Sequence, residues 1–384
     1  MSFDIDDEDR EYFYKQHGRK PSTSRWHGPR RSRSTTVIAI LTVAVLYLYL
    51  FPRARNNKVD WSRYAYSQYA TDPQSMCNAF MVFEALHRLG SKAERVLLYP
   101  EEWDTTISDT LDRNSQLLVR AEKQYKVILN PVKLIGAGGN EQPGTIQQPS
   151  DWDASITKLR AFELTEYERV LHLDSDITLL QHLDELFLLP KAQVAMPRAY
   201  WANPPRATQD EARAWPLTSL LLLLEPNRAE LQHMLETIRH WQQQPNYTSR
   251  KYDMDILNHR FGSSAMVLPH RPYALLTAEF RQHDHSPYLG KPPGMASWDA
   301  DAVLKEAKLV HFSDWPLPKP WIMWPLEGLK EMQPDCGGSH VGTCRERVIW
   351  KELYDDFRKR RKDLCRILSV PAPAWEKAKN STTP

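Results

Sequence analysis

The chain has 384 residues, with 41% hydrophobic and 26% charged side chains and a formal net charge of +2 at pH 7. These values exclude collagen, low-complexity disorder and a protein with many membrane spans, and the length suits one large domain with short appendages. Because 50 Lys and Arg are balanced by 48 Asp and Glu, no surplus of positive charge is present for binding phosphate backbones. We therefore expect no nucleic-acid partner.

The N-terminal region is predicted to be a cytosolic tail followed by a membrane anchor. Residues 1–34 mix acidic and basic clusters without apolar periodicity, which is typical of a disordered segment. Residues 35–51 carry no charged side chain and, at about 1.5 Å per residue, can cover roughly 25 Å of hydrocarbon. A cleavable signal peptide is the alternative, but a long tail precedes this run and no clear cleavage site follows it. The excess of Lys and Arg before the run favours a single-pass type II protein with a lumenal body.

The cysteines and glycosylation sequons agree with a lumenal body. All of them follow the predicted span, at Cys77, Cys336, Cys344, Cys365, Asn246 and Asn380. An oxidising compartment favours disulfides. Because only seven residues separate Cys336 from Cys344, these two are the expected bridge, and the full connectivity stays open. A zinc site that uses His340 is the alternative, although no Cys-x-x-Cys spacing supports it.

Residues 64–132 alternate between strand-like and helix-like patterns. Strands are predicted at 64–69, 95–99 and 126–132, and helices at 76–86 and 108–124. Parallel strands joined by right-handed crossovers indicate a doubly wound α/β sheet, in which ligands bind outside the carboxyl ends of the strands. The glycine-rich segment 136–141 is not a dinucleotide-binding loop, because Glu141 occupies the place of the third glycine. No Walker loop is present either.

A pair of aspartates is the most informative local feature. The apolar run 170–173 reads as a buried strand that delivers Asp174 and Asp176 at its carboxyl end. Residues i and i+2 of an extended chain share a face, so the two carboxylates repel each other unless a cation lies between them. Carboxylate oxygens suit Mg²⁺ or Mn²⁺, and such an ion keeps positions open for phosphate oxygens. The sequence has six Asp-x-Asp pairs, and only this one follows a strand-like run.

The segment 157–187 (TKLRAFELTEYERVLHLDSDITLLQHLDELF) resembles the core signature of the family 8 glycosyltransferases, the group that includes glycogenin. That signature has a Lys, an Asp-x-Asp and a Leu-Asp-Glu-Leu-Phe in this order. Segments 218–226, 252–258 and 310–321 are similar to the family's Asn-Ser-Gly strand, its Asp-Gln-x-x-Leu-Asn segment and its closing His-Phe…Lys-Pro-Trp motif. The resemblance covers roughly residues 64–325 and is closest to the fungal Golgi N-acetylglucosaminyltransferases of the family.

The resemblance implies an α/β domain of GT-A type, Rossmann-like, that binds a nucleotide sugar. It implies a Golgi enzyme that transfers a sugar, with N-acetylglucosamine expected, from UDP-N-acetylglucosamine or another UDP-hexose to a lumenal glycan, with retention of configuration. It also implies roles for individual residues: metal ligation for Asp174, Asp176 and His311, nucleotide-sugar binding for Thr71, Lys158, Ser175 and Lys319, and catalysis for Asp253. The expected cofactor is Mn²⁺ or Mg²⁺.

The sequence departs from the family pattern at several places. Thr218 and Leu220 replace the family's Asn and Gly, and Met254 replaces its Gln. His311 also lies two residues farther from Lys319 than in glycogenin. These positions bear on the choice of sugar and acceptor more than on metal binding.

Some of the implied site residues also have purely structural interpretations. Lys158 also fits a solvated helix position, His311 a buried histidine behind a strand, and Asp253 the N-cap of a helix over 254–261. Farther on, the basic run 358–362 is expected to be a solvated helix face.

Two other functions remain open. The run ending in Asp174, Asp176 and Thr178 also matches the opening motif of haloacid dehalogenase-type phosphatases, in which the first Asp attacks phosphorus. In those enzymes this strand opens the domain, whereas here about 100 residues of α/β pattern precede it, and the later pair Asp355 and Asp356 falls in a helix-like stretch. The second alternative is a non-catalytic subunit that binds nucleotide sugars.

The predicted organisation has five parts in chain order. They are a cytosolic tail (1–34), a transmembrane signal anchor (35–51), a short stem (52–63), a GT-A glycosyltransferase domain (64–330) and a helical, cysteine-containing C-terminal extension (331–384).

Overall fold

The computed structural model describes most of the chain after the predicted stem. The described ranges are residues 58–142, 154–202, 215–244, 251–291, 297–337, 343–372 and 374–381. No helix within these ranges is long and apolar enough to cross a bilayer. The predicted tail and span, at 1–34 and 35–51, lie outside them, as do Asn246 and His340.

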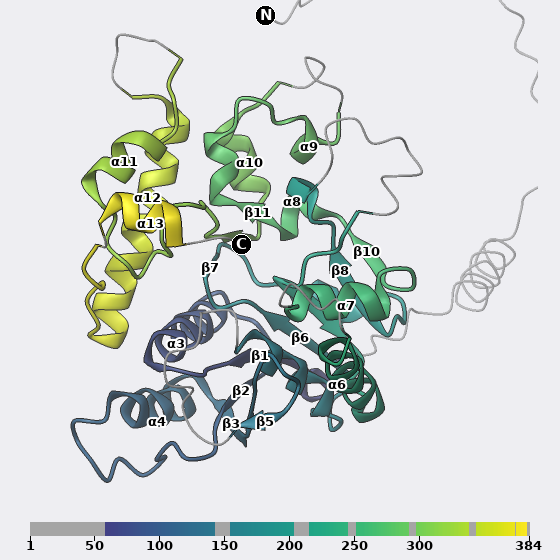
Figure 1. Ribbon diagram of the computed structural model, residues 1–384. Helices are drawn as coiled ribbons and strands as arrows, with labels where there is room; N and C mark the ends of the chain where they lie inside the picture. Colours follow the sequence, from purple (N-terminus) through teal and green to yellow (C-terminus); the bar gives the residue numbers. More distant parts are fainter. Residues whose placement is uncertain are drawn as a thin grey trace, which may run out of the picture. The chain divides into compact units, whose positions relative to one another are not determined.

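A seven-stranded sheet forms the centre of the domain, with strand order β10-β8-β9-β6-β1-β2-β3 (Figure 1). Its strands in chain order are β1 (Tyr64–Tyr69), β2 (Glu94–Pro100), β3 (Val127–Val132), β6 (Arg169–Leu173), β8 (Val194–Pro197), β9 (Leu221–Leu224) and β10 (Met266–Leu268). Strands β3, β2, β1 and β6 are parallel, and β9 runs antiparallel to both of its neighbours. The predicted α/β sheet is therefore confirmed, with one reversed strand.

The first crossover helices begin where side chains can cap them. Helix α3 (Pro73–Arg88) follows β1, and Asp72 accepts hydrogen bonds from the backbone N–H groups of Gln74 (2.7 Å) and Ser75 (3.0 Å). Helix α4 (Arg113–Tyr125) begins later than the predicted residue 108, because Asp112 is its cap.

Helices cover both faces of the sheet, so its carboxyl edge is left for ligands. On one face α3 and α4 bury a core that includes Phe80 and Leu118. On the other face lie the 3₁₀ segment η2 (Ser155–Glu163), α6 (Arg228–Gln242) and α7 (Asp253–Phe261), which contribute Phe162 and Met234 to a second core.

A smaller sheet joins distant parts of the chain. It has the order β11-β12-β7, formed by β11 (Leu275–Leu276), β12 (Leu309–His311) and β7 (Ile177–Leu179). Strands β12 and β7 pair antiparallel with His311 opposite Ile177, and the N–H of Phe312 donates to the carbonyl of Asp176 (3.0 Å). This register brings His311 next to the end of the Asp-x-Asp segment.

The glycine-rich segment 136–141 contains the turn between two short strands. Strands β4 (Leu134–Ile135) and β5 (Glu141–Gln142) pair antiparallel, and Gly139 has a φ of 69°, a conformation that glycine adopts easily. The prediction that this segment is not a dinucleotide-binding loop agrees with this geometry.

Further helical segments, most of them short, complete the described residues. They are η1 (Trp61–Arg63), η3 (Asp184–Leu188), η4 (Tyr200–Ala202), α8 (His270–Tyr273), η5 (Thr277–Arg281), α9 (Ser286–Leu289), α10 (Ala300–Glu306), α11 (Leu326–Met332), α12 (Arg345–Arg360), the π-helical turn η6 (Arg361–Cys365) and α13 (Trp375–Ser381).

One of the two disulfides ties the C-terminal region to the domain, and the other lies within that region. The expected bridge Cys336–Cys344 is confirmed, which leaves neither thiol free for the alternative zinc site. The second bridge, Cys77–Cys365, joins α3 to η6. The prediction of a solvated basic face at 358–362 is wrong for Arg361, which is 1% exposed. Periodicity did not reveal that α3 supplies this buried guanidinium with hydrogen-bond acceptors.

Candidate active site

A cavity of about 580 Å³ opens beyond the carboxyl ends of β1 and β6. Its lining includes all eight residues that the sequence analysis selected for the site: Thr71, Lys158, Asp174, Ser175, Asp176, Asp253, His311 and Lys319. In the sequence these eight residues extend from Thr71 to Lys319, over most of the domain. The fold brings them together around one cavity.

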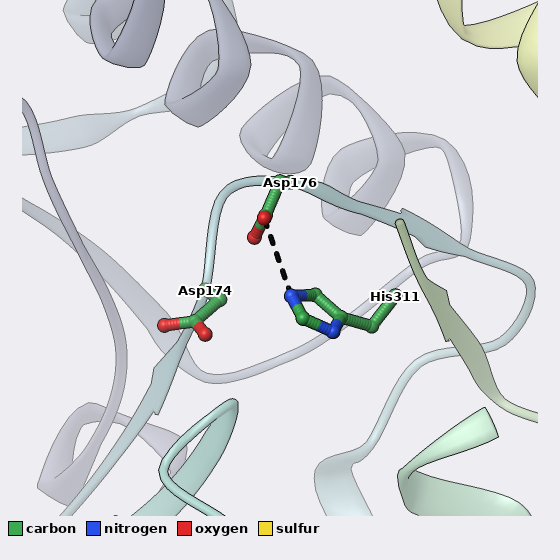
Figure 2. Close-up of side chains that lie close together, drawn as sticks. All are labelled: Asp174, Asp176 and His311. Carbon is green, nitrogen blue, oxygen red and sulfur yellow. Dashed lines mark ion pairs between the residues drawn. The ribbon is translucent and has the colours of Figure 1, made fainter. Parts of the chain in front are cut away.

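Two carboxylates and one imidazole converge in this cavity (Figure 2). Asp174, Asp176 and His311 each offer one ligand atom, and these atoms all lie within 4.8 Å of one another. The Nε2 atom of His311 is 3.2 Å from Oδ2 of Asp176. Among the described residues, no other group of three or more His, Cys, Asp or Glu has this geometry.

The backbone fixes the positions of these three residues. Asp174 follows the last residue of β6, and its N–H donates to the carbonyl of Leu220 (2.8 Å), just before β9. Asp176 precedes β7, and His311 ends β12, the strand paired with β7. Two different sheets thus hold the three ligand candidates.

Lys158 connects two of the acidic residues. Its Nζ lies 2.6 Å from Oδ1 of Asp174 and 2.6 Å from Oδ2 of Asp253. The interpretation as a solvated lysine is wrong, because the residue is 2% exposed. Burial by itself lowers the pKa of Lys158, but the two carboxylates outweigh it and raise this pKa above its ordinary value. Lys158 is thus a permanent cation within the site.

Asp253 is held by hydrogen bonds inside the cavity. Residue Tyr252 is the N-cap of α7, so the interpretation of Asp253 as the cap is wrong. The hydroxyl of Ser219 donates to Oδ2 of Asp253 (2.6 Å), the same oxygen that Lys158 contacts. Burial opposes ionisation, but Lys158 and these hydrogen bonds lower the pKa of Asp253 below its usual value. Asp253 is therefore an ionised carboxylate.

The two aspartates of the pair differ in acidity. Burial raises the pKa of Asp174 more than Lys158 lowers it, and the neighbouring carboxylates raise it further. Burial also acts on Asp176, but His311 and Lys319 reverse its effect and hold the pKa of Asp176 below its usual range. The ammonium of Lys319 lies 2.5 Å from Oδ2 of Asp176.

These residues fit a divalent cation. Ligand atoms that share one ion lie roughly 3–5 Å apart when each bond is about 2.0–2.5 Å long, and the observed limit of 4.8 Å meets that condition. Two carboxylates and one imidazole are also a donor set that Mn²⁺ or Mg²⁺ accepts. The expected metal site is therefore geometrically feasible.

Several cavity residues were not selected from the sequence. Tyr69, Gln74, Asn78, Trp201, Tyr252 and Trp321 also line it. The rule that ligands bind where a parallel strand enters its crossover helix would have indicated Gln74 and Asn78, which lie in the first two turns of α3. We find no comparable local signal for Trp201. The positions where the chain departs from the family pattern, Thr218, Leu220 and Met254, line the cavity as well.

The geometry gives little support to a phosphatase. Asp355 and Asp356, the later acidic pair, are exposed on α12, and neither lines the cavity that contains Asp174. The strand that carries Asp174 is also the fourth of the parallel group in chain order, after β1, β2 and β3.

Comparison with known proteins identifies the family. No family model matches the chain. An Aspergillus fumigatus protein named glucose N-acetyltransferase 1 is 51% identical over 324 residues, which cover 82% of this chain and 80% of the relative. The chain belongs to the glucose N-acetyltransferase 1 family. A Gibberella zeae protein of the same name is 43% identical and matches 83% of this chain and 66% of its own length. Membership in this family agrees with the resemblance to fungal family 8 enzymes, and the chain is a glycosyltransferase.

Solved structures show more distant similarity. The glycosyltransferase GlyE of Streptococcus pneumoniae TIGR4 has a TM-score of 0.45 and 16% identity, over 82% of this chain and 66% of GlyE. The galactosyltransferase LgtC, solved with donor and acceptor sugar analogues, has a TM-score of 0.44 and 12% identity, over 76% of this chain and 95% of LgtC.

Proposed function

We propose that this protein transfers N-acetylglucosamine from a UDP-sugar to a lumenal glycan, with retention of configuration and with a divalent cation as cofactor. The observation that carries the proposal is the convergence of Asp174, Asp176 and His311 within 4.8 Å in a cavity that also contains two lysines. A cation-binding group beside fixed positive charges suits a diphosphate leaving group.

The metal ligands and the lysines would act on the leaving UDP. Asp174, Asp176 and His311 would hold Mn²⁺ or Mg²⁺, which when bound supplies positive charge to the diphosphate oxygens. Lys319 adds a cation on the Asp176 side of the group. Lys158 adds another on the Asp174 side. These charges are already in place before the reaction, so little reorganisation is needed as negative charge develops on UDP.

Asp253 is the proposed catalytic carboxylate. Retention requires either a carboxylate nucleophile or departure and attack on the same face of the sugar, and in both cases positive charge develops at the anomeric carbon. Lys158 and Ser219 keep Asp253 ionised and fixed within the cavity. The carboxylate can therefore stabilise that charge and position the acceptor.

The name of the relatives supports the choice of donor sugar. It combines glucose with an N-acetyl group, as N-acetylglucosamine does. Thr218, Leu220 and Met254, which line the cavity, are the proposed determinants of sugar choice.

We further propose that the enzyme is a type II protein of the Golgi membrane, with residues 35–51 as its anchor. The uncharged run, the two sequons and the disulfides Cys77–Cys365 and Cys336–Cys344 support this location.

A donor screen tests the proposed reaction. Full-length protein in detergent with Mn²⁺ is supplied with one UDP-sugar at a time and a mixture of glycan acceptors, and UDP release is measured. We expect turnover with UDP-N-acetylglucosamine, its loss in excess chelator, and a fall of about 100-fold or more in D174N and D176N. D355N, which removes an exposed carboxylate on α12, is the matched control and should retain full activity.

Other outcomes would point elsewhere. Undiminished turnover after exhaustive chelation would contradict the metal site. Release of inorganic phosphate from simple phosphoesters would favour the phosphatase. Binding of UDP without turnover on any acceptor would favour a non-catalytic subunit.

A further inference from the structure

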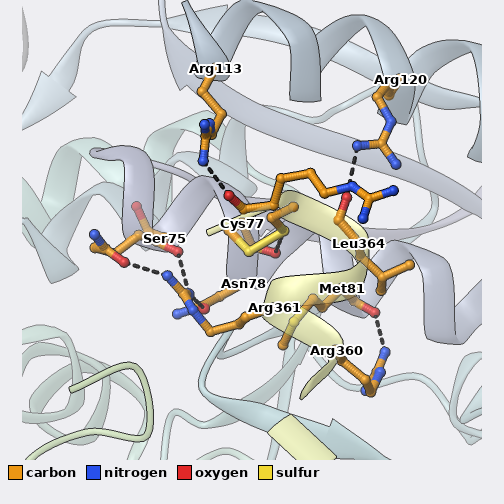
Figure 3. The surroundings of a disulfide bond; sticks show 12 residues. Ser75, Cys77, Asn78, Met81, Arg113, Arg120, Arg360, Arg361 and Leu364 are labelled. Carbon is orange, nitrogen blue, oxygen red and sulfur yellow. Dashed lines mark hydrogen bonds between the residues drawn. A yellow bond between two sulfur atoms is a disulfide. The ribbon is translucent and has the colours of Figure 1, made fainter. Parts of the chain in front are cut away.

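Arg361 does not line the cavity itself, but it contacts two residues that do. It lies in the turn η6 and is 1% exposed. Its Nη1 donates to Oδ1 of Asn78 and to the backbone carbonyl of Gln74 (3.3 Å), and its Nη2 donates to the side-chain Oε1 of Gln74. Figure 3 shows this guanidinium reaching α3 from the C-terminal segment. Both Gln74 and Asn78 line the cavity.

These contacts determine how the two carboxamides are oriented. A guanidinium has only hydrogen-bond donors, so a carboxamide must turn its oxygen toward it. With both oxygens engaged by Arg361, the NH₂ groups of Gln74 and Asn78 are left to donate elsewhere. The wall of the cavity formed by α3 therefore offers donors and suits a ligand rich in oxygen acceptors.

The turn that carries Arg361 is fixed independently of that residue. The Cys77–Cys365 disulfide joins it to α3. From α4, Arg120 donates to the carbonyl of Leu364 (2.7 Å), and Arg113 donates to that of Arg366. If the Arg361 side chain is removed, these contacts still hold the turn against α3 and α4. The main change is then the loss of the hydrogen bonds to Gln74 and Asn78.

Resting on the proposed function, we infer that Arg361 is a positioning residue for the UDP-sugar donor, acting through Gln74 and Asn78. In parallel α/β sheets a nucleotide binds where the strands enter their helices, and these two residues lie in the first two turns of α3, directly after β1. In this proposal the C-terminal extension contributes to the donor site through Arg361, which orients Gln74 and Asn78.

Binding of UDP tests this role. Full-length protein in detergent with Mn²⁺ is titrated with UDP by calorimetry, and steady-state kinetics give KM for donor and acceptor. We expect R361M to raise the Kd of UDP and the KM of the donor by roughly tenfold, the effect of one to two lost hydrogen bonds. The KM of the acceptor should stay within about twofold, and R361K should recover part of the affinity.

Two further variants separate positioning from stability. R120M removes a contact to the same turn without touching Gln74 or Asn78, so it should lower the melting temperature and leave the Kd of UDP unchanged. Q74L retains Arg361 but removes one carboxamide, and should weaken UDP binding by a similar factor. If Arg361 acts through Gln74, the effects of Q74L and R361M on the Kd are not additive in the double variant.

The outcomes separate the two proposals. Normal UDP binding by R361M, or an equal rise in Kd for R120M and R361M, would overturn the proposed role of Arg361. The proposed function would not be affected by either result. A wild-type protein that does not bind UDP would overturn the proposed function and this role together.

Discussion

Lys158 is the residue whose loss we expect to be most harmful to the fold. It is the ammonium between Asp174 and Asp253; Lys158 and Asp253 are buried, and Asp174 is partly buried. In K158M the two carboxylates face each other without a cation, and breaking such a buried pair costs about 3–5 kcal/mol of unfolding free energy. Chemical denaturation of the metal-free protein measures this. K305M, at an exposed position of α10, should change the free energy of unfolding by less than about 0.5 kcal/mol, and equal losses in both variants would contradict the role of Lys158.

The acidity of Asp174 predicts a pH-dependent response to metal. Burial raises the pKa of Asp174 above its usual value despite Lys158, so a proton competes with a cation for this carboxylate as the pH falls. Asp176, whose pKa is held low by His311 and Lys319 against the effect of burial, is not the limiting ligand. The rise in melting temperature caused by Mn²⁺ should therefore be larger at pH 7 than at pH 5. A rise of equal size at both values would count against this assignment, and D174N should show none.

At the scale of single elements, the two disulfides should differ in their contribution. Cys77–Cys365 closes a loop with a sequence separation of 288, and Cys336–Cys344 one of 8. The chain-entropy model assigns about 5–6 kcal/mol to the first and about 2–3 kcal/mol to the second. The double Ser variant of Cys77 and Cys365 should therefore have the lower melting temperature. A larger loss for the pair Cys336 and Cys344 would show that local packing, and not chain entropy, dominates.

Elements with strong local patterns were predictable from the sequence. β1 has the predicted bounds 64–69, and it begins with the aromatic residues Tyr64 and Tyr66 in alternation with the small residues Ala65 and Ser67. The apolar run before Asp174 and Asp176 predicted that the two aspartates lie at the carboxyl end of a strand, and the structure shows this strand as β6. The start of α4 was misplaced, because a turn held by Asp104 precedes its cap at Asp112.

Features that depend on distant parts of the chain were not predictable in this way. The proximity of His311 to Asp176 depends on the pairing of β12 with β7, and only the family resemblance indicated it. The burial of Arg361 depends on acceptors in α3, and a count of charges along 358–362 does not show them. The link from Lys158 to Asp253 is likewise a tertiary contact.

At the scale of the whole molecule, the proposed topology predicts membrane attachment and glycosylation. Full-length protein made in a eukaryotic host should pellet with membranes and resist alkaline carbonate, whereas a chain without residues 35–51 should not. Asn246 should carry a glycan, because its sequon would face the lumen. Endoglycosidase treatment should remove that glycan and increase the electrophoretic mobility of the protein. N246Q is the control that should remove the part of this mobility shift that comes from Asn246, and the second sequon at Asn380 accounts for any remainder. Extraction of the full-length protein by carbonate would contradict the anchor.

The pairing of β12 with β7 also has a consequence for biosynthesis. When the ribosome has synthesised the chain only as far as β9, Asp174 and Asp176 are present, but His311 has not yet been translated. Before the later strand docks, the acidic pair has no imidazole partner and only part of its positive surroundings. Capture of a cation should therefore be a late event in maturation, and a chain that stalls before residue 311 should remain inert toward nucleotide sugars.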